Sequence, residues 1–141
     1  IITEPLNIHQ VLRSALAVSR PLLESIVVEE RYDPSLPLMQ GNEGLLLQAL
    51  RNIIKNAAEA MQGSETKPKL ILHTYFQTGF YRQSQEGYKE AAPLTLDVID
   101  TGPGVPADIR NRLFEPFVTR KSEGKGLGLA IVAKIIADHR G

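Results

Sequence analysis

Hydrophobic residues recur with the spacing of a helix in three segments of the chain, at residues 7 to about 23, about 42 to 61, and about 127 to 139. Asn7 stands at the start of the first segment, where an asparagine side chain can cap a helix. We therefore predict three helices.

Strand patterns fall between these helices, at residues 25–33, 69–76 and 94–100, where β-branched and aromatic residues are frequent. The polar segment 77–93 predicts a protruding hairpin or loop, and residues 107–114 predict a short helix followed by an irregular stretch. This order of elements favours an α/β two-layer sandwich of the α+β kind, with a mixed sheet packed on three helices.

Composition narrows the class of protein. The chain has 141 residues, which suits one domain, and 43% hydrophobic and 23% charged residues, as in ordinary globular proteins. No apolar run is long enough to cross a bilayer, so we expect no direct membrane contact. Cysteine is absent, which excludes disulfides and thiolate metal sites and favours the cytoplasm. Sixteen basic residues balance sixteen acidic ones, which argues against nucleic-acid binding.

A polar stripe crosses the second predicted helix, where Gln48, Asn52, Asn56 and Glu59 are spaced by four, four and three residues. A solvated face is one interpretation. Asparagine, however, is less favourable in a helix than alanine by roughly half a kcal/mol, and its carboxamide can ligate magnesium or donate to a phosphate oxygen. Both interpretations remain open on spacing alone. The residues predicted to face the core are Leu46, Leu50, Ile53, Ile54, Ala57 and Met61.

Asp100 ends an apolar strand and immediately precedes the turn that contains Gly102 and Gly104. Aspartate, glycine and proline all favour turns, so the motif can be purely structural. A carboxylate at the end of a buried strand also needs a donor, and the exocyclic amine of a purine is one such donor. These two interpretations are equally open.

A second glycine-rich segment, with Gly124, Gly126 and Gly128, precedes the last predicted helix. Exposed backbone amides and the helix dipole attract an anion there, and the glycines leave space for a phosphate. The spacing is not that of a P-loop, because Thr119 occupies the position of the first glycine. It is not a dinucleotide-binding fingerprint either, because the run does not follow a strand.

Four stretches in order, "NIIKNAAEA", "DTGPGV", "LFEPFVTRK" and "GKGLGLAIV", resemble the N, G1, F and G2 boxes of the ATP-binding catalytic domain of sensor histidine kinases. The resemblance covers nearly the whole chain and implies a Bergerat-type ATP-binding fold. Within that family, "DPSLP", "NAAEAM" and the polar hairpin are most similar to nitrogen-regulation sensors of the NtrB type.

The resemblance implies that Mg²⁺ and ATP are bound. Asn56 matches the residue that holds magnesium, and Asn52 matches its partner facing the phosphates. Asp100 matches the residue that recognises the adenine amino group, with Gly102 and Gly104 shaping the pocket.

The lid and the last glycine-rich turn also have counterparts in the family. Phe114 and Phe117 match the F box, Thr119 and Lys121 match the end of a short lid, and Lys121 is expected to contact the γ-phosphate. With Asn52 and Asn56, Lys121 completes the expected catalytic set. The residues expected to follow the phosphates along the G2 turn are Gly124, Lys125, Gly126, Leu127, Gly128 and Leu129.

Three positions depart from the family pattern. Glu59 stands where many members carry a phosphate-binding lysine, so positive charge must come from Lys55, Arg120, Lys121 or Lys125. Arg120 and Lys125 each replace a threonine. The family also continues past the final "HRG" with two further strands, so we expect residues 1–141 to form one catalytic domain that is truncated at its C-terminal end.

The resemblance implies transfer of the γ-phosphoryl group to a histidine on a separate dimerisation and histidine-phosphotransfer domain of the same kinase, which forms a homodimer at full length. A response regulator, of the NtrC type by resemblance, would be the next partner. None of the three histidines lies in the acidic helical setting of a phospho-acceptor, so we expect them to be structural; at His139 a cation would favour the helix dipole.

Other functions stay open. A gyrase-like ATPase would share the fold, but it carries a glutamate base in place of Asn52, and a neutral amide cannot accept a proton from water. A serine-directed kinase of the anti-sigma type is a smaller alternative. The third is a nucleotide-binding or partner-docking module without kinase activity.

Overall fold

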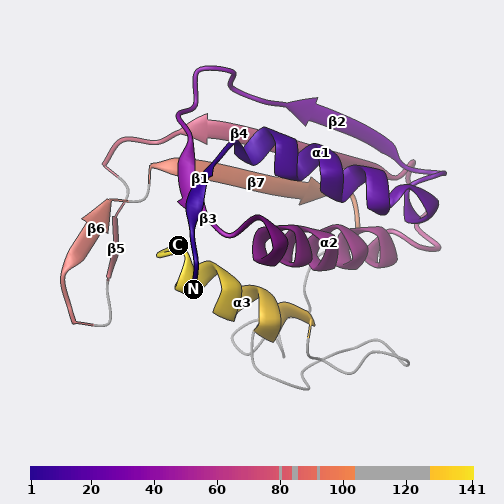
Figure 1. The fold of residues 1–141 in the computed structure, drawn as a ribbon. Helices are drawn as coiled ribbons and strands as arrows, with labels where there is room; N and C mark the ends of the chain where they lie inside the picture. Colours follow the sequence, from indigo (N-terminus) through magenta and orange to yellow (C-terminus); the bar gives the residue numbers. More distant parts are fainter. Residues whose placement is uncertain (80, 84–85, 92, 104–127) are drawn as a thin grey trace.

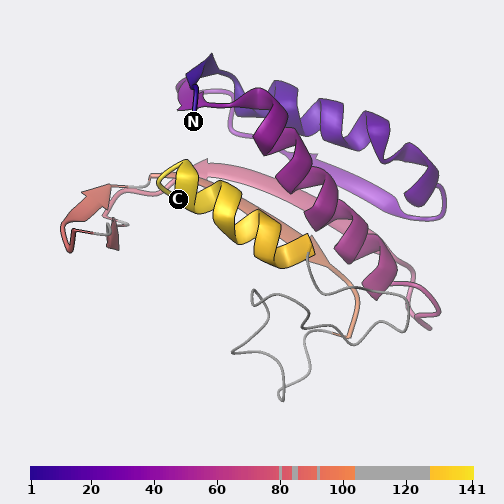
Figure 2. The same ribbon diagram turned by 60° about the horizontal axis from the view of Figure 1, so that its bottom comes forward.

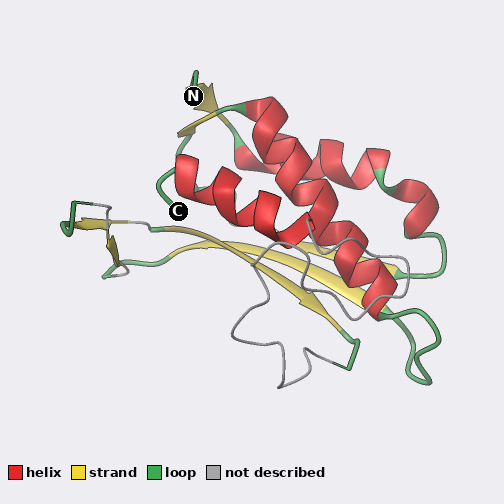
Figure 3. Ribbon diagram, turned by 90° about the horizontal axis from the view of Figure 1, so that it is seen from below, coloured by secondary structure: helices red, strands yellow, loops and turns green. Residues whose placement is uncertain are grey.

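The computed structural model describes residues 1–141 except residues 80, 84–85, 92 and 104–127. The described chain forms two layers, with all three α-helices on one face of the main sheet (Figures 1 and 3). This confirms the predicted two-layer sandwich with a mixed sheet. The helices are α1 (Ile8–Val18), α2 (Glu43–Ala60) and α3 (Gly128–Asp138), and the main strands are β2 (Val27–Arg31), β4 (Lys69–Phe76) and β7 (Leu94–Asp100).

The main sheet has the order β2-β4-β7. Strand β4 is parallel to β2, with Val28 opposite Leu70, and antiparallel to β7, with Leu72 opposite Val98. Every second residue of β4 faces the helices, so Leu70, Leu72 and Thr74 are buried, whereas the residues between them are partly exposed. The free carboxyl end of β7 therefore carries Asp100 to the same end of the molecule as the carboxyl end of α2 (Figure 1).

Two short ribbons accompany the main sheet. Strands β1 (Glu4–Leu6) and β3 (Met39–Gly41) pair antiparallel near the start of α2 and were not predicted, because three residues are too few to show alternation. Strands β5 (Tyr81–Gln83) and β6 (Lys89–Ala91) also pair antiparallel and project from the sandwich (Figure 1). The predicted hairpin at 77–93 is thus confirmed.

The first helix is shorter than predicted. It starts as expected, with Asn7 Oδ1 accepting a hydrogen bond from the backbone N–H of His9 at 2.9 Å, but it ends at Val18 rather than near residue 23. A 3₁₀ turn, η1 (Arg20–Leu22), follows. The cause is Pro21, which has no N–H to continue the α-helical ladder. Helix α2 starts close to the predicted position, and the structure shows that the Asn42 side chain caps it.

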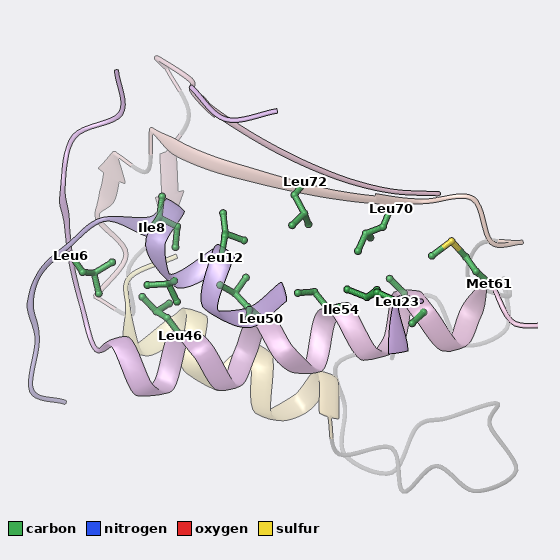
Figure 4. Packing of buried hydrophobic residues seen from close by; sticks show 14 residues of the cluster. Leu6, Ile8, Leu12, Leu23, Leu46, Leu50, Ile54, Met61, Leu70 and Leu72 are labelled. Carbon is green, nitrogen blue, oxygen red and sulfur yellow. The ribbon is translucent and has the colours of Figure 1, made fainter. Parts of the chain in front are cut away.

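Helix α2 packs on two sides. One side faces α1 and the sheet in the main core (Figure 4), where Ile54, Leu70 and Leu72 are almost fully buried. The other side faces α3, where Ala49 contacts Val132 and Ile135 in a second cluster. Ile53 was expected in the main core but is half-buried against this second cluster. The remaining predicted core residues of α2, which are Leu46, Leu50, Ile54, Ala57 and Met61, are all in the main core.

One buried histidine joins α1 to the sheet. His9 is 7% exposed, its Nε2 lies 2.8 Å from Thr74 Oγ1, and its ring stacks on Tyr32 at 4.7 Å between centroids. Burial lowers the pKa of His9, the nearby positive charge of Arg13 lowers it further, and Asp33 opposes both. The geometry agrees with a structural histidine. Within the described ranges, no helix has the length and hydropathy needed to cross a bilayer.

Candidate functional site

Helices α2 and α3 lie antiparallel (Figure 2), which sets the start of α3 beside the second half of α2. The two ends of α3 show this arrangement. His139, just after α3, hydrogen-bonds the backbone of Asn42 at the start of α2, and Gly128, the first residue of α3, lies beside Asn52. The polar stripe of α2 therefore passes under the first turn of α3.

Asn52 is half-buried, and its Oδ1 is 3.8 Å from the position that a Cβ atom on Gly128 would occupy. The carboxamide oxygen thus faces the start of α3 at Gly128, which has no side chain. Asn56 lies one turn further along the same face of α2 and is also half-buried, whereas Gln48, one turn before Asn52, is exposed. The two asparagines do not lie on a fully solvated face.

Asp100 adopts the turn conformation that the sequence left open. Its Oδ1 accepts a hydrogen bond from the backbone N–H of Gly102 at 2.8 Å. A Cβ atom on Gly102 would lie 2.9 Å from the carbonyl oxygen of Ala60, so this position requires glycine and the turn packs closely on the end of α2. A carboxylate has about four acceptor positions, so the bond to Gly102 leaves capacity for another donor.

Thr101 fixes the same turn and was not among the predicted site residues. Its Oγ1 accepts a hydrogen bond from the backbone N–H of Lys69 at 3.1 Å and lies 3.4 Å from Met61 Sδ. The turn is thereby attached to the start of β4 and to the end of α2. The sequence could have indicated this role, because Thr101 carries a hydroxyl group and lies between Asp100 and Gly102, two residues of the predicted pocket.

Lys55 lies between the two asparagines in the sequence, directly before Asn56. Its side chain is 59% exposed, and its Nζ lies 3.9 Å from Glu59 Oε1. An exposed pair at this distance contributes at most about 1 kcal/mol. Lys55 can therefore exchange Glu59 for a phosphate at small cost, which fits the prediction that it supplies positive charge.

The described residues offer magnesium few protein ligands. Across the part of the chain that the structure describes, no group of three or more His, Asp, Glu or Cys side chains could hold a metal ion. Mg²⁺ commonly takes one or two protein oxygens and completes its octahedron with phosphates and water. The carboxamide of Asn56 suits that mode of binding, so the donor set fits an ion that arrives with a nucleotide.

The structure thus brings together Asn52, Asn56, Lys55 and Gly128 on the two antiparallel helices, with Leu129 half-buried in the first turn of α3, and it places Asp100 and Gly102 at the end of α2. The remaining predictions fall outside the described residues; they concern Gly104, Phe114, Phe117, Thr119, Arg120, Lys121, Gly124, Lys125, Gly126, Leu127 and the short helix at 107–114.

Comparison with known proteins identifies the family. Residues 41–141 match the family described as "Histidine kinase-, DNA gyrase B-, and HSP90-like ATPase". "Sensory histidine kinase/phosphatase NtrB" of Rhizobium leguminosarum bv. phaseoli is 45% identical over 97% of this chain. The chain spans only 36% of that relative's length.

Two solved histidine kinases have a similar structure. The mycobacterial sensor histidine kinase MprB has a TM-score of 0.77 and 26% identity over 99% of this chain and 81% of its own. Full-length ShkA, in complex with AMPPNP, has a TM-score of 0.73 and 30% identity over 97% of this chain and 26% of its own. The matched residues, the shared architecture and the identity to the NtrB relative agree, and they confirm the resemblance to sensor histidine kinase catalytic domains. The chain therefore belongs to the histidine kinase-, DNA gyrase B- and HSP90-like ATPase family.

Proposed function

We propose that this chain binds Mg-ATP between α2, α3 and the end of β7, and donates the γ-phosphoryl group to a histidine on a separate dimerisation domain. The observation that supports this most is the position of the Asn52 carboxamide beside Gly128 at the start of α3. That arrangement places an amide donor and the positive end of a helix dipole around one space.

Adenine would bind at the β7 end of this space. Asp100 holds its own turn through Gly102 and keeps acceptor capacity for the adenine amino group. Replacing Asp100 with asparagine removes the charge but keeps an oxygen for the Gly102 bond, so it should weaken adenine nucleotides without unfolding the turn. Asp97→Asn is the matched control, because Asp97 lies on the same strand but alternates to the opposite face of the sheet.

The phosphates would follow the first turn of α3, facing the asparagines. Magnesium bound with ATP bridges phosphate oxygens and neutralises their charge, and Asn56 would hold it through its carboxamide oxygen. Asn52 would orient the phosphates, and Lys55 would add positive charge once released from Glu59. Lys121 would reach the γ-phosphate from the lid.

Phosphoryl transfer needs little covalent chemistry from the protein, because positioning and charge neutralisation supply most of the rate enhancement. A site of carboxamides, glycines and lysines suits this task. The neutral amide of Asn52 cannot serve as a general base, which disfavours hydrolysis of the gyrase type. His9 and His139 are engaged in structural hydrogen bonds, and His73 lies in strand β4 with its Nδ1 4.0 Å from Asp97 Oδ2, so the acceptor histidine would lie on another domain.

The name of the NtrB relative supports a finer proposal. We propose that the whole protein is a nitrogen-regulation kinase, homodimeric through its dimerisation domain, that passes phosphate to a response regulator of the NtrC type. Mixing this chain with dimerisation domains and response regulators from nitrogen and unrelated systems would test the pairing. Equal labelling of all of them by radioactive ATP would contradict it.

Calorimetric titration with a non-hydrolysable ATP analogue, with and without magnesium, tests the main proposal. We expect micromolar to millimolar binding that magnesium strengthens, and Asn56→Ala should remove the effect of magnesium. Gln48→Ala is the control on the same helix face, since Gln48 is exposed two turns before Asn56. Absence of binding at millimolar nucleotide would favour the partner-docking alternative. Acid-labile phosphate on an added dimerisation domain would distinguish a kinase from an ATPase.

A further inference from the structure

One side chain joins the end of α3 to the start of α2. His139 Nε2 lies 2.9 Å from the backbone N of Asn42, and His139 Nδ1 lies 2.7 Å from the carbonyl oxygen of Ile135. A backbone N–H can only donate, so Nε2 accepts and Nδ1 carries the hydrogen that it donates to Ile135. This arrangement therefore uses the tautomer that carries its hydrogen on Nδ1. We call these two hydrogen bonds the His139 bridge.

The surroundings of the ring are built closely around it. A Cβ atom on Gly41 would lie 3.2 Å from His139 Cδ2 and 2.9 Å from Leu46 Cδ1, so the ring fits because residue 41 has no side chain. Asn42, which bonds to the ring through its backbone, also caps α2 by accepting a hydrogen bond from Leu45 N at 3.0 Å. The His139 bridge thus ends on the residue that begins the asparagine-bearing helix.

The backbone after His139 is equally constrained. Arg140 has a φ of 60°, a left-handed conformation in which glycine is usual. Its N–H donates to Ala137 O at 2.9 Å, and Gly141 N–H donates to Ile136 O at 2.9 Å, which together form a Schellman motif. This motif holds His139 at the end of α3 in a single orientation.

We propose that His139 is a positioning residue for the nucleotide site, and that it sets where the first turn of α3 lies relative to Asn52. The inference rests on the proposed nucleotide binding. Between the helices, Val132 and Ile135 make apolar contacts with Ala49, and such contacts resist separation more than rotation. The His139 bridge adds a directional contact at the far end of α3, and this prevents the helix from rotating about Val132.

A small rotation is enough to affect binding. Gly128 is four residues from Val132, or about 6 Å along a helix. A rotation of α3 by about 10° around Val132 would therefore move Gly128 by about 1 Å, a displacement that can cost on the order of 100-fold in a positioned reaction. We expect loss of the bridge to weaken nucleotide binding by about tenfold or more.

A pair of substitutions isolates the bond to α2. In His139→Asn the side chain can still donate near Ile135 O but is too short to reach Asn42, whereas in His139→Gln the amide oxygen reaches the place of Nε2. His9→Asn is the matched control, because His9 loses a similar contact that joins α1 to the main sheet through Thr74 and does not involve α2 or α3. Binding of a non-hydrolysable ATP analogue with magnesium is measured by calorimetry, and amide hydrogen exchange is followed along α3.

We expect His139→Asn to bind at least tenfold more weakly, with faster exchange in α3, and His139→Gln to recover to within about threefold of the unmodified chain. His9→Asn should lower the melting temperature while leaving affinity within twofold. Unchanged affinity in His139→Asn, or an equal loss in His9→Asn, would overturn the positioning role alone. If the unmodified chain binds no nucleotide at millimolar concentration, the proposed function fails and this inference fails with it.

Discussion

Gly128→Ala separates folding from nucleotide binding in a single substitution. Gly128 is the first residue of α3, and an added methyl group would stand 3.8 Å from Asn52 Oδ1, which is an ordinary van der Waals distance. The residues that the structure describes leave room for this methyl group. The same methyl group would occupy space that the proposed phosphates need.

The substitution should affect stability and nucleotide affinity in opposite directions. Alanine is favoured over glycine by up to about 1 kcal/mol within a helix, so the free energy of unfolding should stay the same or rise slightly. A phosphate oxygen bonded to Asn52 would lie about 3 Å from the carboxamide and would therefore meet the new methyl group. Overpacking of this kind costs about 1 to 3 kcal/mol, which corresponds to roughly 5- to 150-fold weaker binding.

Thermal unfolding and calorimetric titration with a non-hydrolysable ATP analogue measure the two quantities on the same sample. Gly44→Ala is a close control, because Gly44 lies in the first turn of α2 and its added Cβ would stand 3.5 Å from another asparagine oxygen, Asn42 Oδ1. It should show a similar change in melting temperature and no change in affinity.

The proposed location of the phosphates would be refuted if Gly128→Ala bound the analogue as tightly as the unmodified chain. A large loss of stability would refute the 3.8 Å separation instead. An equal loss of affinity in Gly44→Ala would show that changes anywhere in the helix layer weaken binding, and the site would then need to be sought elsewhere.

Three further predictions concern stability. Gly102→Ala should lower the free energy of unfolding by about 1 to 3 kcal/mol, because its Cβ would meet the Ala60 carbonyl at 2.9 Å; thermal unfolding tests this. Arg140→Gly should raise stability by about 1 kcal/mol by relieving a left-handed conformation, and unchanged denaturant midpoints would contradict it. Burial lowers the pKa of His9 in the folded chain, so as the pH falls His9 is protonated first in the unfolded chain. The stability that the neutral, buried ring contributes is fully present above about pH 6.5 and should be lost as the pH falls through the folded pKa. Urea titrations of His9→Phe should therefore show a smaller pH dependence of the free energy of unfolding.

The long elements could be predicted from sequence because each repeats its pattern over several turns or alternations. Helix α2 keeps an apolar face over 18 residues, so both its extent and the face that it buries were evident. The three-residue strands β1 and β3 carry no such signal, and their pairing depends on their place beside the ends of the helices. The early end of α1 was predictable in principle from Pro21, whose missing N–H outweighs continued apolar spacing.

The candidate site was predictable to the extent that its residues share an element or a motif. Asn52 and Asn56 follow from the spacing of one helix, and Asp100 with Gly102 from one turn. The His139 bridge could not be foreseen, because it joins residues that are 97 positions apart in the chain. Its partner is a backbone N–H, which every residue except proline offers, so no side-chain pattern could reveal the contact.

The placement of polar groups on α2 explains why this helix can serve both folding and binding. One side of α2 is committed to the main core and another to Val132 and Ile135 of α3, which leaves the asparagine stripe as the face beside the first turn of α3. Any tilt of α3 changes both the second cluster and the distance between Gly128 and Asn52. Stability of the helix pair and geometry of the phosphate site are therefore coupled, and substitutions in the α2–α3 cluster, such as Val132→Ala, should weaken nucleotide binding as well as folding although they touch no ligand.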